Sequence, residues 1–570
     1  MKNFIKFLFI YIFISTIAYA SFVPTVPETT LQVAREAEIK EAFSKPKSEI
    51  IRVGIGDINF KNYDYSEVNI FGTANIEILN NNTPILIAGS NEIINIKLQS
   101  GMFIISKNNQ VLEQVNGPIK FICKNGLLGV KDLKRAGSQA LYRGEFELVK
   151  NNKRMSKFHV VNVLEVEEYL KGVVPNEMPV SFGLEALKAQ SVAARNYVLS
   201  PRTKAYEAFD VVDSVASQVY FGANTERPLS NKAVEETEGI VAIYGWDLIL
   251  AQYCSTAGGY TESFSNAFSD PNTKQFPSTT KPYLIAKPDM LSQKPIDTDE
   301  AAEEFYTSKP DSYDMKSPYF RWERTWTKEE LETEIQKNIT SQSATGFITP
   351  KFNTGDQLGN IQELKVIKRG ESGKIIEMEI ITDLKNYKIN KELVIRRLLT
   401  NKGKALPSAN IAFKQEFDEN GNLIKITAYG GGYGHGVGMS QYGAGFMSTE
   451  LKFSYDKILK HYYSGITLST KPVVLSAQNN SILQNFYTEN KNAELIIDNK
   501  YKLNHFLVNI NGKEEKIELQ KGFFNRIEKI DISKHIIQGK NTIIYYYPQD
   551  EDKNKGIRLF VELVARDEWR

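Results

Sequence analysis

Short runs of alternating apolar and polar residues dominate residues 49–150 of the chain. Runs such as "VNIFGTANIEIL" and "EIINIKL" tend to alternate apolar with polar side chains, which is typical of strands that bury one face. Paired asparagines at Asn81-Asn82 and Asn108-Asn109 lie where hairpin turns would connect such runs. The pattern predicts a β-rich subdomain over residues 49–150, built as a barrel or a sandwich.

Helical spacing replaces this alternation in the next segment. A helix is expected to begin in "LEVEEYLKGVVP", and "GLEALKAQSVAARNYVL" repeats apolar and small residues three and four positions apart. The second helix should end near Ser200-Pro201. Mixed strands and short helices follow, including hairpins around Gly245 and at "RGESGK". Residues 151–470 are therefore expected to form a mixed, β-rich region with a few helices.

The pattern of apolar and polar residues changes again after Thr470. Runs such as "AELIIDN", "HFLVNING" and "NTIIYYYPQD" predict strands, and no convincing long helix follows. We expect residues 471–570 to form an all-β, sandwich-like domain. The predicted fold class of the whole chain is α+β, with a β-rich N-terminal subdomain, a mixed central region and this C-terminal domain.

The N-terminus has the pattern of an export signal. Two lysines precede an apolar run, and Ala18-Tyr19-Ala20 supplies small residues at the spacing that a signal peptidase reads. Residues 1–20 are predicted to be a signal peptide, with an uncleaved membrane anchor as the alternative. Residues 21–48 are polar and are expected to form a helical or loose stalk. In either case the remainder is expected in the periplasm, in the cell envelope or outside the cell.

Charge and cysteine content narrow the possible functions. The 70 basic and 68 acidic side chains give a formal charge of +2, so a nucleic-acid partner is not indicated. Only two cysteines are present, Cys123 and Cys254, which is too few for a disulfide scaffold. A single disulfide and two buried free thiols are both compatible with the sequence.

The stretch from Gly430 to Phe446, "GGGYGHGVGMSQYGAGF", contains eight glycines and no acidic side chain. Glycine allows positive φ and lets a ligand approach the backbone closely. The interleaved aromatic and hydrogen-bonding side chains are those that recognition of a sugar or polyol would use. A binding site is therefore predicted here, and a tightly packed structural turn is the alternative.

A second stretch, "EEYLKGVVPNEMPVSF", places Glu177 between Pro175 and Pro179. The two prolines predict a stiff loop ahead of the following helix. Apolar neighbours disfavour the charged form of the carboxylate, so its pKa is expected to rise toward neutral, as a general acid requires. The alternative is an ordinary surface or capping glutamate.

Four blocks in this order resemble the stage II sporulation protein D family, whose members act on bacterial cell-wall glycan. They are "VLEVEEYLKGVVPNEMP", "EALKAQSVAARNYVL", "STAGGYTES" and "GYGHGVGMSQYGA", and weaker matches lie between them. The resemblance implies a peptidoglycan lytic transglycosylase that cuts the bond from N-acetylmuramic acid to N-acetylglucosamine and leaves 1,6-anhydro ends. Glu177 matches the essential acid of the family and would act as both general acid and general base.

The resemblance also implies which other residues would line the glycan groove. The expected substrate-contacting or site-shaping residues are Lys188, Gln190, Arg195, Ser255, Thr256, His435, Gln441 and Tyr442. For Lys188 and Arg195, a structural ion pair is an equal alternative. No carboxylate in the matched blocks stands out as a clear second catalytic candidate, which agrees with an intramolecular nucleophile rather than with hydrolysis.

One departure from the family pattern and one alternative function accompany the resemblance. Cys254 occupies a position where the family commonly has histidine, and some relatives bind zinc nearby. Cys254 and the distant His435 offer too few ligands, so no metal or cofactor is expected, and a structural zinc is the alternative. Because some family members enhance cell-wall amidases, the alternative function is a non-catalytic, glycan-binding enhancer whose partner is such an amidase.

Overall fold

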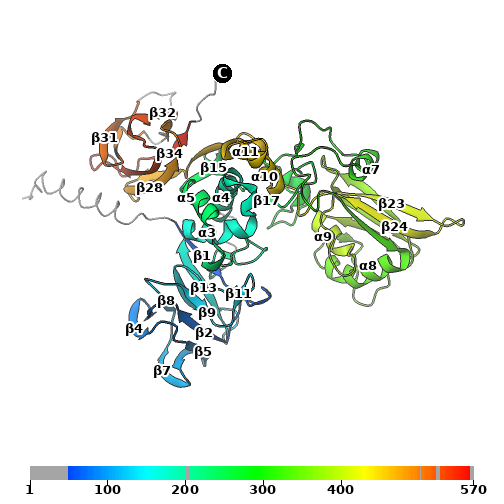
Figure 1. Cartoon of the computed structure of the whole chain (residues 1–570), viewed down its shortest axis with the longest axis horizontal. Coiled ribbons are helices and arrows are strands. Elements are labelled where there is room, and N and C mark those ends of the chain that lie inside the picture. Colours follow the sequence, from blue (N-terminus) through cyan, green and yellow to red (C-terminus); the bar gives the residue numbers. More distant parts are fainter. Residues whose placement is uncertain (1–48, 201–205, 501, 521–526, 565–570) are drawn as a thin grey trace, which may run out of the picture. The chain divides into compact units, whose positions relative to one another are not determined.

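In the computed structural model of the protein, the structure describes residues 49–200, 206–500, 502–520 and 527–564 (Figure 1). The predicted signal peptide, residues 1–20, and the predicted stalk, residues 21–48, lie outside the described residues. Within the described ranges, no helix combines the length and the apolar character that crossing a bilayer requires. The fold class is α+β and rich in strands, as predicted.

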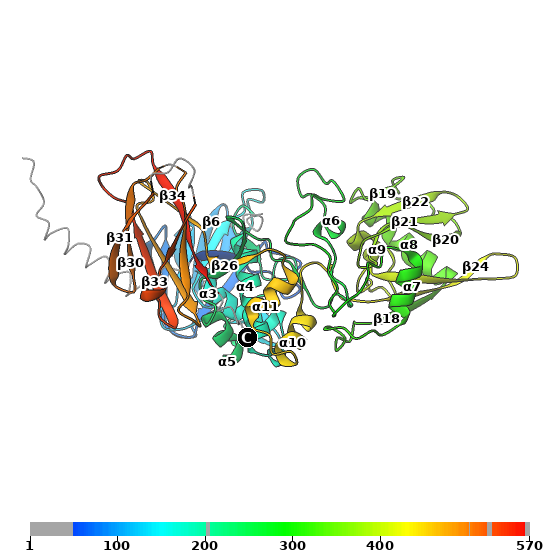
Figure 2. The same ribbon diagram turned by 90° about the horizontal axis from the view of Figure 1, so that it is seen from above.

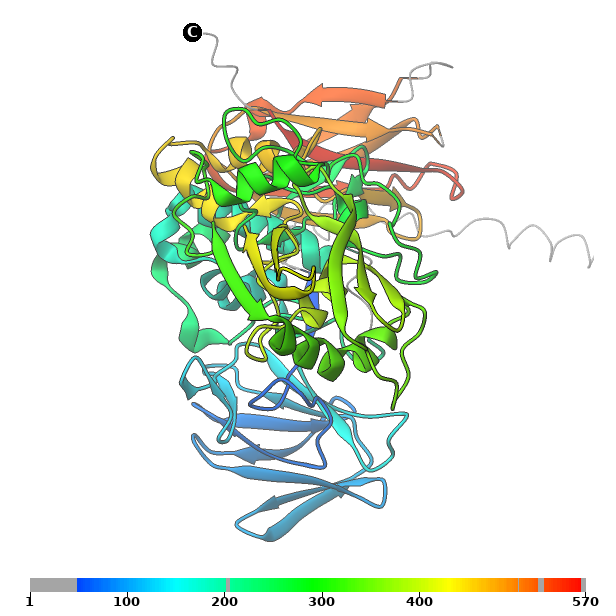
Figure 3. The same cartoon turned by 90° about the vertical axis from the view of Figure 1, so that its right-hand side faces the viewer.

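The N-terminal subdomain is formed by two sheets with a shared apolar interior, which Figure 3 shows as stacked blue strands, and their pairings are antiparallel except for the short parallel pairing of β1 with β14. The two asparagine pairs adopt positive φ between 48° and 67° at hairpin turns, which confirms that prediction. The first sheet has the order β14-β1-β13-β12-β8-β3-β4 and the second β7-β6-β5-β2-β9. The strands are β1 (Ile50–Gly54), β2 (Glu67–Gly72), β3 (Ile76–Asn80), β4 (Thr83–Ala88), β5 (Ile94–Gln99), β6 (Met102–Lys107), β7 (Gln110–Val115), β8 (Ile119–Ile122), β9 (Leu128–Val130), β12 (Glu145–Lys150), β13 (Phe158–Glu165) and β14 (Val211–Val212).

The helices that follow pack around α4 (Leu184–Leu199). This helix contacts its neighbours closely because Ala189, Ala193 and Ala194 are fully buried and present little side-chain bulk. It ends at Leu199, as the sequence predicts. The contacting elements are α3 (Val166–Glu177), α5 (Pro228–Glu235), α10 (Gln441–Thr449), α11 (Tyr455–Tyr462) and β15 (Ile240–Tyr244).

An insertion between the third and fourth motif blocks has a separate apolar core around Trp326. One sheet has the order β18-β24-β23, and the other has the order β19-β22-β21-β20. The predicted "RGESGK" hairpin joins β20 to β21. A capping box at Thr327 and Glu330 begins α8. The elements are α7 (Asp299–Thr307), β18 (Trp322–Thr327), α8 (Lys328–Ser343), β19 (Ile348–Thr349), β20 (Ile361–Arg369), β21 (Ile375–Thr382), β22 (Asn386–Asn390), α9 (Glu392–Leu398), β23 (Ile411–Phe417) and β24 (Leu423–Gly430).

The C-terminal strands form two sheets, as the sequence predicts (Figure 2). One has the order β28-β33-β30-β31, and the other joins β27, β29, β32 and β34 to β26 (Thr467–Thr470) and β15. The expected boundary between residues 470 and 471 thus falls between strands of one sheet and stays a prediction. The strands are β27 (Val473–Ser476), β28 (Ser481–Thr488), β29 (Ala493–Asp498), β30 (His505–Ile510), β31 (Lys513–Glu518), β32 (Ile527–Asp531), β33 (Gly539–Tyr546) and β34 (Gly556–Leu563).

Candidate functional site

Glu177 is the last residue of α3, so the prediction that a stiff loop carries this residue is wrong. Pro175 lies inside the helix, where its ring removes one backbone N–H donor. The helix tolerates it because the proline falls in the final turn, and Met178 closes that turn with an N–H bond to the Val174 carbonyl, at 3.0 Å. The carboxylate therefore projects from the C-terminal end of a packed helix.

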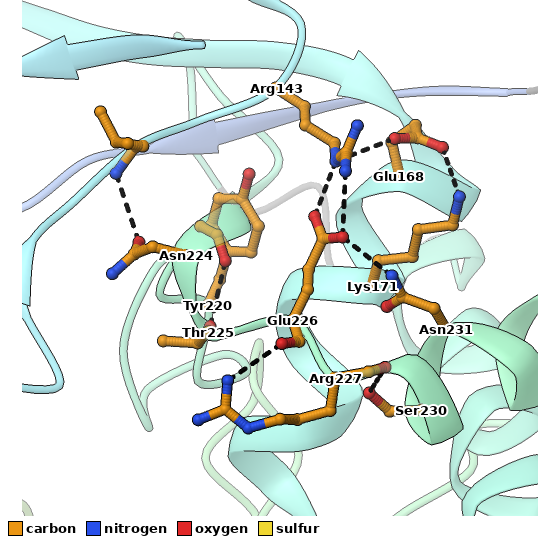
Figure 4. A network of polar contacts seen from close by, with 12 residues as sticks. Arg143, Glu168, Lys171, Tyr220, Asn224, Thr225, Glu226, Arg227, Ser230 and Asn231 are labelled. Atoms are coloured by element: carbon orange, nitrogen blue, oxygen red, sulfur yellow. Dashed lines mark hydrogen bonds and ion pairs between the residues drawn. The ribbon is translucent and has the colours of Figure 1, made fainter.

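A polar network holds the outer side of α3 (Figure 4). The Arg143 guanidinium forks onto the carboxylate of Glu226, at 2.6 and 3.0 Å, and lies 3.2 Å from Glu168 on α3. Lys171 pairs with the same Glu168, at 2.8 Å. Bidentate arginine pairs fix geometry as well as adding energy. The helix that carries Glu177 is thereby tied to the loop before α5.

The Glu177 side chain is half-buried. Burial raises the pKa of this carboxyl group to about 7, while hydrogen bonds from Val219, Gln441 and Tyr253 oppose the rise. The predicted increase in pKa is confirmed. At neutral pH the carboxyl group is therefore divided between its protonated and charged forms, and part of it reaches solvent.

The donors around Glu177 belong to a longer chain of hydrogen bonds. The backbone N–H of Val219 donates to Oε1, at 2.7 Å. Tyr253 receives a hydrogen bond from Gln218, at 2.8 Å, and Gln218 in turn accepts one from Tyr169, at 3.3 Å. These contacts fix the direction in which the carboxyl group points.

On the other side, Gln441 links the glycine-rich block to Glu177. Its Nε2 also donates to Gln190 Oε1 on α4, at 3.2 Å. Of the expected residues, the structure thus brings Gln190 and Gln441 together with Glu177.

The glycine-rich block runs beside the third motif block. Strand β25 (Met439–Ser440) pairs in parallel with β17 (Tyr253–Cys254), and an isolated bridge joins Thr256 to Tyr433. Glycine is required at Gly438, where φ is +72° and a Cβ atom would lie 2.1 Å from the Gln252 carbonyl oxygen. The block is therefore a tightly packed turn, and it also delivers Gln441 to Glu177, whereas the predicted binding site stays a prediction.

Thr256, Ser255 and Tyr442, which were also expected at the site, make contacts with residues other than Glu177. Thr256 is buried and donates its hydroxyl proton to Asp314. Ser255 is half-buried, and its carbonyl accepts a hydrogen bond from the Tyr442 N–H, at 3.1 Å. The Tyr442 ring packs edge-on against Phe182, with ring centroids 4.9 Å apart. Ser255 and Tyr442 thus meet directly beside Gln441.

His435 is held as a neutral ring. Burial, together with the nearby charges of Lys374 and Arg396, lowers its pKa to about 3. Its Nδ1 accepts the backbone N–H of Val437, at 3.0 Å, and its ring packs against Phe268. His435 thus supports the block and does not titrate near neutral pH.

Lys188 on α4 is buried in an ion-pair cluster. Its ammonium contacts the carboxylates of Glu185, at 3.0 Å, Glu236, at 2.8 Å, and Glu489. Burial lowers the pKa of this lysine, but the three carboxylates outweigh burial and raise it.

Arg195 on the same helix is also buried and forks onto Glu167 of α3, at 2.6 and 2.8 Å. It further donates to the carbonyl of Ile240, at 3.0 Å. Both cations are occupied by protein groups, which favours the structural ion pairs that the sequence left as an alternative.

The cysteines are both free and buried, so the two-thiol alternative holds. Burial raises the pKa of the Cys254 thiol to about 12, so this thiol is protonated at neutral pH. Within the described ranges, no three His, Cys, Asp or Glu side chains are grouped as metal ligands. The residues present around Cys254 therefore do not fit a zinc site.

Sequence reasoning missed the residues that approach Glu177 from outside the strongest blocks. Val219 and Gln218 lie in the weakly matched stretch "DSVASQVYFG", and Tyr253 directly precedes Cys254. Neither periodicity nor charge marks these positions. Only the weak match in the gap between blocks carried a signal for Gln218 and Val219.

Two family models match parts of this chain. A family model described as "Stage II sporulation protein" matches residues 154–244, which include α3 and α4. A second family model, described as a domain of unknown function, matches residues 270–438, which include the insertion.

Three similar relatives match over about half of this chain. "Amidase enhancer" of Bacillus subtilis (strain 168) is 34% identical over 316 residues, which are 53% of this chain and 40% of that protein. An uncharacterized protein of Brachyspira hyodysenteriae is 30% identical over 312 residues, 54% of this chain and 68% of the relative. "Stage II sporulation protein D" of Bacillus subtilis (strain 168) is 30% identical over 332 residues, 55% of this chain and 78% of the relative. The chain therefore belongs to the stage II sporulation protein D family.

Proposed function

We propose that this protein is an exported peptidoglycan lytic transglycosylase in which Glu177 is both the general acid and the general base. The observation that carries the proposal is the half-buried carboxyl group of Glu177, whose pKa is about 7 and whose surroundings combine three motif blocks. A group with a pKa near the working pH donates and accepts protons with comparable ease. Export rests on the predicted signal in residues 1–20.

The reaction needs one proton to travel out and one to return. Protonated Glu177 gives its proton to the glycosidic oxygen as the bond from that oxygen to C1 of the muramic acid breaks. The 6-hydroxyl oxygen of the same sugar then bonds to C1, and the Glu177 carboxylate takes the hydroxyl proton. The carboxyl group ends as it began, and the products are a 1,6-anhydro end and a free 4-hydroxyl.

A single carboxyl group suffices because the nucleophile is part of the substrate and has a high effective concentration. A hydrolase would place a second carboxylate about 5 to 10 Å away. Among the described residues, only burial and hydrogen-bond donors contribute to the pKa shift of Glu177, and no neighbouring carboxylate does.

The test is product analysis on two glycan substrates, one stripped of stem peptides and one that retains them. Wild-type protein is expected to generate anhydro ends, detected by mass spectrometry, and Glu177→Gln is not. Glu165→Gln is the matched control, because Glu165 is the exposed residue directly before the same helix and makes no capping hydrogen bond. Absence of anhydro ends from both substrates with wild-type protein would overturn the proposal.

A second candidate function is supported by the similarity to the relative named "Amidase enhancer". In this reading the protein binds glycan and stimulates a cell-wall amidase without cutting the strand. The same protein preparations separate the two functions. Equal stimulation of an amidase by wild type and Glu177→Gln, with no anhydro ends from either, would establish the enhancer and exclude catalysis by Glu177.

A further inference from the structure

A cavity of about 860 Å³ lies where the insertion meets the glycine-rich block. Its cationic lining comes from three elements of the insertion: Arg324 on β18, Arg396 on α9, and Lys402 and Lys404 on the turn after α9. Glu323 is the one acidic side chain that lines this cavity. The lining is therefore strongly cationic, although the whole chain is almost neutral.

Most of these cations are not neutralised by the protein. Arg396 lies 3.3 Å from Glu392, but no carboxylate of the described residues pairs with Arg324, Lys402 or Lys404. Both lysines are exposed. Unpaired cations from separate elements that converge on one cavity favour an anionic ligand. Guanidinium groups match the planar geometry of a carboxylate.

Two tyrosines complete the cavity. The rings of Tyr319 and Tyr433 lie with their centroids 4.5 Å apart, and Tyr433 is 44% exposed although it belongs to the tightly packed glycine-rich block. The backbone on either side is fixed, because Gly432 N–H donates to the Tyr319 carbonyl, at 2.8 Å, and Gly434 N–H to that of Pro407, at 3.0 Å. A fixed aromatic ring beside cations offers a surface for the apolar face of a sugar.

We propose that this cavity is an accessory binding site for a carboxylate-bearing aminosugar strand, in which the cations bind carboxylates and the tyrosines pack against sugar rings. The identification of the ligand rests on the proposed function. One continuous segment links the two sites, because the block that presents Tyr433 to the cavity also presents Gln441 to Glu177. A strand bound in the cavity is thereby held by the same segment that lines the acid.

The test measures binding in the full-length Glu177→Gln background, so that cutting plays no part. The probes are a glycan strand without stem peptides, whose muramic acids carry free carboxylates, a strand with stem peptides, and a neutral chitooligosaccharide of equal length. The variant is Lys402→Glu with Lys404→Glu. The control is Lys337→Glu with Lys351→Glu, which changes the net charge equally at exposed positions of the insertion outside the cavity.

The cavity variant is expected to weaken binding of at least one carboxylated strand tenfold or more and to leave chitooligosaccharide binding unchanged, while the control binds as the parent does. The strand that loses affinity identifies the carboxylate as that of muramic acid or of the stem peptide. Equal binding of both carboxylated strands by variant and control would overturn the accessory site. Tighter binding of a poly(glycerol phosphate) chain than of either strand would also overturn it. Because the readout is binding, failure here is distinguishable from a wild-type protein that cuts no glycan.

Discussion

Glu177 and Glu262 belong to two of the motif blocks, and burial raises the pKa of both carboxyl groups. Their surroundings differ. Glu177 is half-buried at the end of α3, whereas Glu262 is completely buried and accepts hydrogen bonds from Ser263, Asn266 and Ser372, at 2.8, 2.9 and 2.6 Å. Even the neighbouring backbone closes on Glu262, since a Cβ atom on Gly370 would lie 2.2 Å from its Oε2.

This difference shows that a raised pKa alone does not mark a catalytic acid. A proton donor must also reach a substrate atom within hydrogen-bonding distance. The carboxylate oxygens of Glu262 accept hydrogen bonds from protein donors and hold together the turn after "STAGGYTES". Part of the Glu177 carboxyl group, in contrast, is accessible to solvent. We therefore expect substitution of Glu177 to affect mainly activity and substitution of Glu262 to affect mainly stability.

The largest expected effect is on activity. Glu177→Gln should lower kcat about 10²–10⁴-fold, which is the usual cost of losing general acid-base catalysis. Glu262→Gln, assayed below its own melting temperature, should keep kcat within about tenfold, well short of that loss. Turnover of peptide-free glycan, followed by release of anhydro ends, measures both. A kcat for Glu262→Gln as low as that of Glu177→Gln would erase the distinction.

The next effect is a pH-dependent gain in stability for Glu177→Gln. Because the folded pKa of Glu177 is about 7 and its unfolded value is near 4.5, the folded protein binds more protons between these pH values, and stability falls as pH rises through that window. The full cost above pH 7 is about 3 kcal/mol. Urea unfolding at pH 4 and pH 8 should show the variant gaining relative to wild type at the higher pH. A constant difference would mean that Glu177 is not buried enough to titrate this way.

A smaller loss of stability is expected for Glu262→Gln. The amide replaces one acceptor oxygen with a donor group, which then faces the N–H or O–H donors of Ser372 or those of Ser263 and Asn266. Leaving such buried groups unsatisfied costs about 1–3 kcal/mol. Thermal unfolding at pH 8, where the wild-type side chain is mostly charged, measures the change. Glu165→Gln serves as the neutral reference, and a Glu262→Gln protein as stable as this reference would contradict the structural role.

The smallest effect concerns the donors to Glu177. The Tyr253 hydrogen bond lowers the pKa of Glu177, so Tyr253→Phe should raise it. In the proposed reaction the protonated carboxyl group acts first, so kcat/KM of the wild type should fall above about pH 7. The pH at which this fall occurs should be higher in the variant. A pH–rate profile on peptide-free glycan gives the shift directly. A fall that moves to lower pH would show that the tyrosine does not stabilise the charged form.

Much of the fold could be predicted from local patterns in the sequence. Paired asparagines located hairpins because positive φ favours them, and the spacing of small residues located α4. The environment of Glu177 was harder to predict. Two prolines indicated a loop, yet tertiary packing overrides that preference when a proline falls in a final helical turn. Tyr253 and Gln218 reach the acid only through chain segments brought together by the fold, and no local pattern encodes such contacts.

The short parallel ladder between β17 and β25 has a consequence for the order of folding. Its two strands lie on opposite sides of the insertion at residues 270–438, so the ladder closes a very long loop of chain. Closing long loops is entropically costly and is therefore deferred until the intervening segment is compact. Gln441, which follows β25, can join Glu177 only after that event. The arrangement of Glu177 and Gln441 on which the proposed activity depends should therefore form only after the insertion has been synthesised and folded, which acts as a built-in delay.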